Sequence, residues 1–264
     1  MKFCIKMDDC NLRSALLAEF PGVCQPEVTD ETELIICNYK DHPQRIKGIL
    51  EPLANKHAQV CFLYLSTSKL YNPGYIEEGN WRFKGKASSE ETHIPLSKDT
   101  DVEMLKTYNC DSFVREYCKS NYIKSAVFRL GCIYGYPLEL AEGFMPKAIL
   151  CCKKKEVFNI YGYGGNQVRD YLHYRDLMTA AKNVLNAPIG FGEIYNIGGG
   201  ITNSMSVNEV VERIRWFKPL ESVYFDEVKD NRPFYATNYE KAARDFTFAP
   251  TIQVIDYIKE EINS

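Results

Sequence analysis

The sequence predicts an α/β fold in which a doubly wound parallel sheet, reduced in its N-terminal half, is joined to a smaller C-terminal α/β lobe. Apolar runs typical of buried strands alternate with helical periods through the first half of the chain, which is the pattern of a parallel sheet covered by helices. With 264 residues, 45% of them hydrophobic, the chain can bury a core of this size. We expect the first unit over residues 1–135 and the second over 136–264, intertwined because a strand and helix around 168–190 return to the first.

The chain opens with a pattern typical of a nucleotide-binding α/β domain. Lys2 to Lys6 predicts a strand, and Asp9 to Phe20 a helix with Leu12, Leu16, Leu17 and Phe20 on one face. Between them, Met7, Cys10 and Arg13 stand where such a domain needs glycines, because only a residue without Cβ lets the backbone approach a pyrophosphate. Asp8 and Asp9 add negative charge at the same turn. We therefore expect the packing to be kept and the pyrophosphate site to be lost.

The next elements follow in the order of a parallel sheet. Strands are predicted at Glu33–Asn38, Val60–Ser66 and Ala126–Ile133, with helices at about Pro43–Lys56 and Asp101–Ser120 between them. Only some fifteen residues separate the first helix from the strand at Glu33, and a parallel crossover needs about a dozen residues or more. The sheet should therefore be smaller than a full dinucleotide-binding fold.

The second half of the chain predicts strands at Val157–Tyr161 and Glu193–Ile197 and a helix at Tyr174–Asn186. Another helix should begin at Ser206, because Ser-Val-Asn-Glu is a capping box that ends on Glu209. Two more helices, at about 238–246 and 252–262, close the chain. Lys153 to Lys155 predicts a solvated turn before a strand.

Composition excludes several classes of function. The net charge of −3 gives no reason to expect nucleic acid or an anionic membrane surface. There is no run of about 18 apolar residues and no secretory signal, so we expect a cytoplasmic protein. The ten cysteines form no Cys-x-x-Cys pair, and the four histidines are scattered. Free buried thiols, with no metal site, account for them best.

Four motifs occur in an order that is informative. They are Ser-Thr-Ser-Lys-Leu-Tyr at 66–71, Phe-Arg-Leu-Gly-Cys-Ile-Tyr-Gly at 128–135, the run at 161–177 that contains Gln-Val-Arg-Asp, and Tyr-Asn-Ile-Gly-Gly-Gly at 195–200. Together they resemble the extended short-chain dehydrogenase/reductases, the NAD-dependent epimerase/dehydratase family with a Rossmann-like sheet. The Gln-Val-Arg-Asp form and Asn203-Ser204 look most like its CDP-paratose (CDP-tyvelose) 2-epimerase branch.

The resemblance implies a set of site residues. Thr67 matches the threonine that hydrogen-bonds the sugar hydroxyl being oxidised, and Arg169 matches the arginine that reaches the substrate diphosphate. Arg232 matches a second phosphate-binding arginine, and Gln167 and Asn203 belong to the same substrate-binding set. Two guanidiniums suit this role, because each can fork onto phosphate oxygens.

Structural alternatives stand beside these roles. Arg169 can instead form an ion pair with Asp170 or Asp176 that holds a turn, and Arg232 can be a surface arginine in a loop. His173 is more typical of a packed structural histidine than of a catalyst.

The catalytic pair of the family is not found. Family members remove a hydroxyl proton with a tyrosine whose pKa is lowered by a lysine four residues later. None of the 18 tyrosines here is followed by lysine at the fourth place. One alignment puts Glu103 and Thr107 at the two positions, and another puts Tyr108 and Ser112 there. Neither alignment has a lysine at the second of the two positions.

Two hypotheses of function follow, with a third, duller explanation. In the first, the chain is a pseudoenzyme that has lost NAD-dependent catalysis, needs no cofactor, and still binds a nucleotide diphosphate sugar or pairs with itself or an active relative through helix 101–120. In the second, it is an active NAD-dependent nucleotide-sugar epimerase or dehydratase with unusual cofactor contacts, using Thr67 with Tyr108 or Glu103. In the third, the shortened N-terminal half reflects a truncated gene product.

Overall fold

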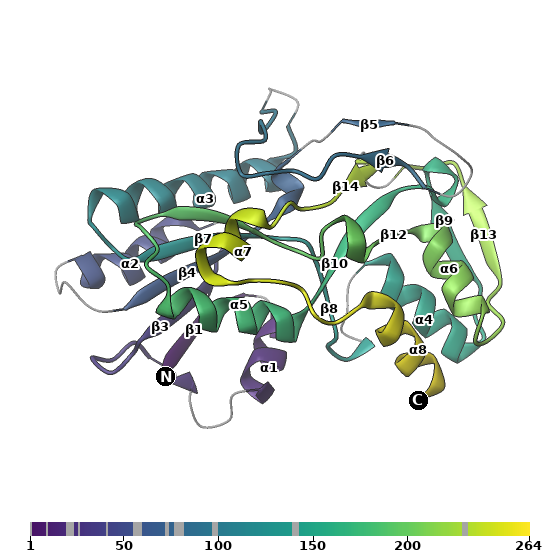
Figure 1. Ribbon diagram of the computed structural model, residues 1–264, viewed down its shortest axis with the longest axis horizontal. Helices are drawn as coiled ribbons and strands as arrows, with labels where there is room; N and C mark the ends of the chain where they lie inside the picture. The colour runs from purple at the N-terminus through teal and green to yellow at the C-terminus, as the bar shows by residue number, and fades with distance from the viewer. Residues whose placement is uncertain are drawn as a thin grey trace.

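A six-stranded parallel sheet carries the N-terminal part of the chain and receives one strand from further along it (Figure 1). The computed structural model describes residues 2–8, 10–19, 24–25, 27–40, 42–54, 60–71, 74–76, 82–96, 100–138, 143–228 and 232–264. The strand order is β11-β7-β4-β3-β1-β2. The strands are β1 (Phe3–Met7), β2 (Cys24–Gln25), β3 (Leu34–Asn38), β4 (Cys61–Thr67), β7 (Ser125–Leu130) and β11 (Glu193–Ile197).

Helices cover both faces of this sheet, as the alternating pattern predicts. On one face lie α1 (Cys10–Glu19), α5 (Tyr174–Asn186) and α7 (Glu240–Phe246), which share a core with β1, β4 and β7. On the other face lie α2 (Pro43–Ala54) and α3 (Val102–Ser120), which pack on the opposite side of the same strands. Leu12 and Leu16 of α1 are buried as predicted and Leu17 is partly buried, while Phe20 lies outside the described residues.

The N-terminal half of the sheet is reduced where the spacing predicted it. The chain passes from β2, at the edge, to β3 on the far side of β1 through residues 26–33, and the described residues 27–33 contain no helix. The prediction missed β2 itself, because two residues of strand leave no period to detect. The expected return of the chain to the sheet also differs: α5 and β11 return, whereas β10 (Val168–His173) belongs to a second sheet.

The second sheet is small and lies in the C-terminal part of the chain. Its central strand β10 pairs with β12 (Ser204–Ser206), β14 (Phe234–Tyr235) and β8 (Cys132–Tyr134). A separate pair, β9 (Phe158–Tyr161) and β13 (Ser222–Phe225), runs beside it. The helices α4 (Phe144–Lys154), α6 (Val207–Arg215) and α8 (Val254–Asn263) bury their apolar faces in a common core with β8, β9 and β10.

Local signals explain several of these boundaries. The capping box predicted at the start of α6 is present, since the Ser206 side chain accepts from the Glu209 N–H and the Glu209 carboxylate accepts from the Ser206 N–H. Helix α4 was not predicted. Lys153 and Lys154 are its last residues, and Lys155, in the left-handed region at φ 58°, ends it.

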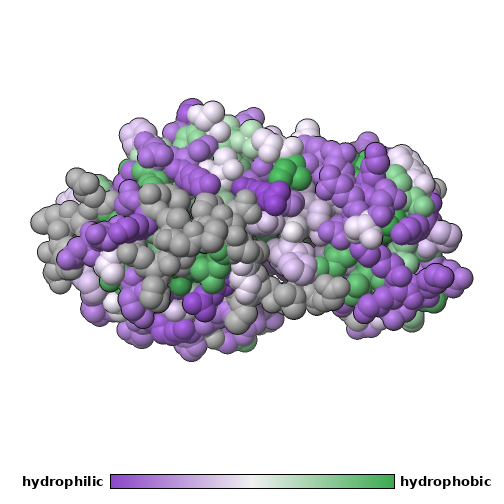
Figure 2. All heavy atoms as spheres, turned by 90° about the horizontal axis from the view of Figure 1, so that it is seen from below, coloured by the Kyte–Doolittle hydropathy of each residue, from purple (hydrophilic) through white to green (hydrophobic). Residues whose placement is uncertain are grey.

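A segment from Arg82 to Glu90 ties the two parts together. It lies along β14, with Phe83 in a small core with Val168 and Phe234. It contains the short strand β6 (Lys84–Gly85), which pairs with the preceding strand β5 (Tyr75–Ile76). Arg82 donates to Ser204 and Glu209 of the C-terminal part at 2.9 and 3.2 Å. Polar side chains cover most of the described surface that Figure 2 shows, and apolar ones form small patches.

Side chains are described for eight of the ten cysteines; these eight are free thiols, and six of them are buried, as expected. Within the described ranges, no helix combines the length and apolar composition that a membrane span requires. In the same ranges, no three side chains of His, Cys, Asp or Glu gather closely enough to hold a metal ion.

Candidate functional site

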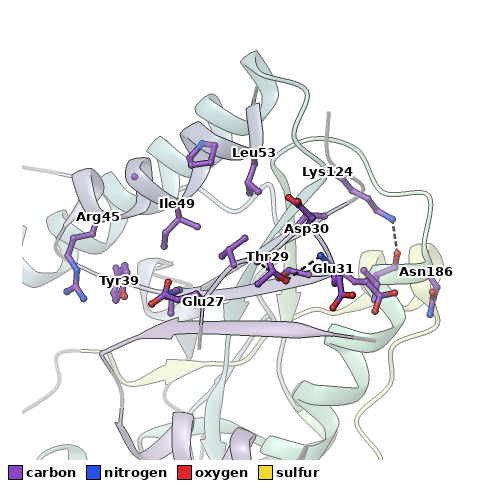
Figure 3. A pocket seen from close by; sticks show the side chains of 18 residues that line it. Glu27, Thr29, Asp30, Glu31, Tyr39, Arg45, Ile49, Leu53, Lys124 and Asn186 are labelled. Carbon is purple, nitrogen blue, oxygen red and sulfur yellow. Dashed lines mark hydrogen bonds and ion pairs between the residues drawn. The ribbon is translucent and has the colours of Figure 1, made fainter. Parts of the chain in front are cut away.

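Two cavities of the protein are lined by side chains of opposite charge. The larger, of about 1300 Å³, lies between α2 and the loop that follows β2, and we call it the acidic cavity. In Figure 3, Ile49 and Leu53 of α2 lie on one side of it, and Glu27, Asp30 and Glu31 belong to the loop. The cavity is found where the chain crosses from β2 to β3 without a helix.

The acidic cavity is a poor site for an anionic ligand. Four carboxylates line it, from Glu27, Asp30, Glu31 and Glu33, against three cationic side chains. Of those three, Lys6 pairs with Glu27 at 2.9 Å, and Arg45 pairs with Asp8 outside the cavity at 3.0 Å. Its size therefore does not make it the candidate site.

The smaller hollow, of about 370 Å³, has the opposite charge, and we call it the basic pocket. Its wall is built by β8, β9, β10, β14 and the start of α4. Lys69, Lys147 and Arg169 line it, and none of the described residues that line it is an aspartate or glutamate. Such a pocket favours an anion.

Arg169 lies at the centre of the basic pocket. Its side chain is buried, donates from Nη1 to the Val168 carbonyl at 2.8 Å, and stacks with its guanidinium carbon 4.5 Å from the centre of the Tyr235 ring. The two carboxylates that the sequence offered as ion-pair partners of Arg169 accept hydrogen bonds from other residues. Asp170 accepts from Thr237, and Asp176 accepts from Thr251 and Ile252. Arg169 thus lines the basic pocket, and its binding of an anion stays a prediction.

Gln167 lines the same pocket with a fixed amide orientation. Its Nε2 donates to the Tyr161 carbonyl at 2.9 Å, and its buried Oε1 has no hydrogen-bond partner. A flipped amide would bring two oxygen atoms together, so Oε1 is the free acceptor. The pocket thus offers one acceptor among its donors.

Three more polar side chains line the pocket near Arg169. Cys132 Sγ lies 2.9 Å from the Tyr235 hydroxyl, and the buried Tyr171 hydroxyl has no hydrogen-bond partner. Burial raises the pKa of the Cys132 thiol and of both tyrosines, so all three groups stay neutral at physiological pH.

Thr67 and Arg232 both contact Lys69. Thr67 Oγ1 accepts from the Lys69 N–H at 3.2 Å and caps the short helix η1 (Ser68–Leu70). Arg232 Nη1 donates to the Lys69 carbonyl at 2.7 Å. The side chain of Lys69 lines the basic pocket, so this residue connects Thr67 to its rim.

The positions of the missing catalytic pair lie on α3. Glu103 is 73% exposed and pairs with Lys106, and Thr107 Oγ1 donates to the Glu103 carbonyl at 2.9 Å. In the other alignment, Tyr108 and Ser112 are half-buried on the opposite side of the helix. Ser66, next to Thr67, donates to Asp111 of α3 at 2.9 Å, which brings Thr67 to this helix.

The turn after β1 holds a carboxylate where a cofactor pyrophosphate would need free N–H groups. Asp8 pairs with Arg45, whose Nη1 lies 3.0 and 3.1 Å from the two carboxylate oxygens and whose guanidinium stacks on Tyr39 at 3.7 Å. Met7 is buried in the core below, and Arg13 is exposed. The side chain of Cys10 lies outside the described residues.

Asn203 does not lie in the basic pocket. It is 2% exposed, its Nδ2 donates to the carbonyls of Tyr171 and Ile252, and its Oδ1 accepts from Val254. These bonds join three segments of backbone, so the described contacts of Asn203 are structural, and its contact with a substrate stays a prediction. His173 is also packed: its Nδ1 accepts from the Arg175 N–H at the start of α5.

The prediction missed Lys69, Cys132, Lys147, Tyr171 and Tyr235 as residues of the pocket. One signal was available, because alternate residues of a strand share a face and Tyr171 follows Arg169 by two. Tyr235 and Lys147 come from segments far along the chain, and only the fold brings them to β10.

Comparisons with known proteins show the family to which this chain belongs. Residues 49–198, more than half of the chain, match the model of the NAD dependent epimerase/dehydratase family. The chain is 29% identical over 139 residues to dTDP-D-glucose 4,6-dehydratase of Dictyostelium discoideum, which covers 52% of this chain and 31% of that protein. It is 24% identical over 233 residues to CDP-paratose 2-epimerase of Salmonella typhi, which covers 81% of this chain and 67% of that protein. The match thus spans about a third of the length of the first relative and about two thirds of the second.

A solved structure shows the same fold. UDP-glucuronic acid 4-epimerase of Bacillus cereus, in complex with UDP-glucuronic acid and NAD, superimposes with a TM-score of 0.73 at 18% identity. The match covers 100% of this chain and 98% of that one.

Proposed function

Because this chain belongs to the NAD dependent epimerase/dehydratase family, we propose that it is a nucleotide-sugar-binding member that has lost NAD-dependent catalysis. The observation that carries the proposal is a contrast within one molecule. The basic pocket has Arg169 and two lysines and no carboxylate among its described lining residues, whereas the turn after β1 holds the Asp8–Arg45 pair.

The turn after β1 does not fit NAD. A pyrophosphate needs close approach to backbone N–H groups at the start of α1, and the Asp8 carboxylate places negative charge at that point. Arg45 cannot compensate, since Asp8 and Tyr39 already engage its guanidinium. The buried side chain of Met7 fills space that a glycine would leave open.

Proton removal from a sugar hydroxyl also lacks its base. At one pair of positions, Glu103 points to solvent and Thr107 offers a hydroxyl in place of an ammonium group. At the other pair, Tyr108 is followed by Ser112, which has no charge to lower the pKa of a tyrosine. Thr67 remains, but a threonine can hydrogen-bond a hydroxyl without oxidising it.

The basic pocket fits a nucleotide diphosphate sugar. Three cationic side chains suit the two negative charges of a diphosphate, and the aromatic and apolar walls from Phe144, Phe158 and Tyr161 suit a base. The free Oε1 of Gln167 accepts one N–H or O–H of the ligand. The Bacillus cereus structure, which holds UDP-glucuronic acid, supports this class of ligand.

A non-catalytic member can act through a partner, and α3 offers the surface. Its buried face consists of Thr107, Cys110, Asp111, Val114 and Cys118. The partly buried Leu105 and the exposed Asn109 and Glu116 lie on the opposite side of the helix. We propose that this outer side pairs with a second copy of the chain or with an active relative.

Thermal-shift measurements test the proposal, because a ligand that binds only the folded state raises the melting temperature. We expect CDP-, UDP- or dTDP-sugars at millimolar concentration to raise it, and NAD and NADP to leave it unchanged. A rise with NAD, together with turnover of a nucleotide sugar, would instead support an active epimerase or dehydratase.

A further inference from the structure

Four polar side chains of the basic pocket share one face of the small second sheet. Arg169 and Tyr171 alternate along β10 and therefore point to the same face. Tyr235 of β14 is the register partner of Arg169, and Cys132 of β8 is the register partner of Tyr171. Register partners in parallel strands share a face, and all four residues line the pocket.

The Tyr171 hydroxyl is the unusual member of this group. Tyr171 is 3% exposed, and its Oη is buried without a hydrogen-bond partner. A buried hydroxyl without a partner destabilises a fold, so its presence needs a reason other than packing. A phenylalanine would pack against Tyr134 and Phe144 just as well.

The Cys132–Tyr235 pair also has a hydrogen left over. The thiol and the hydroxyl lie 2.9 Å apart and share one hydrogen bond, which uses one of their two hydrogens. Whichever group donates, the hydrogen of the other remains available. Burial raises the pKa of both groups, so both hydrogens are present at neutral pH.

Arg169, Tyr171 and the Cys132–Tyr235 pair therefore offer a cation and two neutral donors side by side, with no carboxylate among the described residues of the wall. Phosphate oxygens are acceptors without hydrogens of their own, and they match such a group. We propose that the Tyr171 hydroxyl is an additional phosphate donor of the basic pocket, which bonds the diphosphate of the ligand beside Arg169. This inference rests on the proposed function of the pocket.

Tyr171→Phe tests the inference, because it removes the hydroxyl alone. Isothermal titration of the full chain with inorganic pyrophosphate, CDP and UDP should show Kd values raised about tenfold, as expected for loss of one hydrogen bond to a charged group. The melting temperature of the unliganded variant should be equal or higher, since an unpartnered buried group is lost. A merely structural role of the hydroxyl would lower it.

Tyr134→Phe is the matched control. The Tyr134 hydroxyl is also buried, but it donates to the Ile252 carbonyl at 2.8 Å and does not line the pocket. This variant should lower the melting temperature and leave the Kd values unchanged. The two substitutions thus have opposite effects on the two readouts.

A second measurement does not depend on any variant. At alkaline pH, where part of the Cys132 thiol ionises despite its raised pKa, pyrophosphate should slow the carbamidomethylation of Cys132 by iodoacetamide and leave that of Cys151, which is outside the pocket, unchanged. Equal Kd values for the wild type and Tyr171→Phe, or unprotected Cys132 at saturating pyrophosphate, would overturn the inference and leave the proposed function standing. A wild-type chain that binds none of the three probes would overturn both.

Discussion

Asp111 of α3 and Arg129 of β7 form a buried ion pair, with Arg129 Nε 2.9 Å from Oδ2 and Nη2 3.0 Å from Oδ1. The two side chains are 0% and 2% exposed. Ser66 donates to the same carboxylate, and the remaining Arg129 nitrogen donates to the Tyr71 hydroxyl at 3.0 Å. This ion pair holds α3 against the end of β4, next to Thr67. The helix is therefore held beside Thr67 even though it carries no tyrosine followed by lysine at the fourth place.

Asp111→Ala should destabilise the protein strongly, because it leaves the Arg129 guanidinium buried without its partner. Loss of one member of a buried pair costs about 3–5 kcal/mol, which urea denaturation measures. Glu51→Ala is the control, since its pair with Lys47 on α2 is about half-exposed and should contribute about 0.5 kcal/mol or less. Similar losses of unfolding free energy for both variants would show that the buried Asp111–Arg129 pair stabilises the fold no more than an exposed pair does.

Arg169→Gln should weaken binding of a nucleotide diphosphate without unfolding the chain. The variant loses the central cation of the basic pocket, so the Kd should rise by about tenfold to a hundredfold, or roughly 1.5–3 kcal/mol. Calorimetric titration measures this change. Arg215→Gln, an exposed arginine of α6, should leave the Kd as it is. An unchanged Kd for the Arg169 variant would place the ligand elsewhere.

Two buried thiols should make stability fall at alkaline pH. Burial raises the pKa of Cys37 and Cys61 to about 12. The thiols of the unfolded chain ionise near pH ~8.5, so from there to about pH 12 only the unfolded state gains from ionisation. Urea midpoints should decline across that window, and Cys37→Ser with Cys61→Ser should flatten this decline. A decline equally steep in the double variant would assign it to other groups.

The proposed pairing through α3 can be separated from ligand binding. Leu105→Arg places a charge on the side of the helix opposite the buried face. Sedimentation velocity should show a dimer for the wild type at micromolar concentration and a monomer for the variant, while Kd values for nucleotides stay the same. A wild type that sediments as a monomer would leave self-association without support and shift attention to an active relative.

Much of the large sheet was predictable, because its strands are long apolar runs separated by regular helices. The reduction of the sheet near β2 was also predictable, because the fifteen residues between the first helix and the strand at Glu33 leave no room for another crossover helix. Helix α4 was missed although Pro146 in its first turn and buried Met145, Ile149 and Cys152 fit a helical period. The small sheet was largely missed because β8, β12 and β14 have two or three residues each.

Of the residues that the sequence predicted to bind a substrate, Arg169 and Gln167 line the basic pocket. Arg169 lies in the pocket as the motif indicated, but Asn203, from the same set, uses its whole amide to join Tyr171, Ile252 and Val254. A sequence motif does not say whether a polar side chain faces a ligand or its own backbone. Cys132 and Tyr235 illustrate the reverse case, since neither attracts notice until the register of β8, β10 and β14 brings them together.

The central claim is that this chain keeps the nucleotide-sugar pocket and has lost the NAD site. Isothermal titration of the purified chain with NAD, and separately with CDP-, UDP- and dTDP-sugars, tests it most directly. We expect measurable binding of at least one nucleotide sugar, weakened by about tenfold to a hundredfold in Arg169→Gln, and no heat of binding with NAD up to millimolar concentration. Micromolar binding of NAD would contradict it.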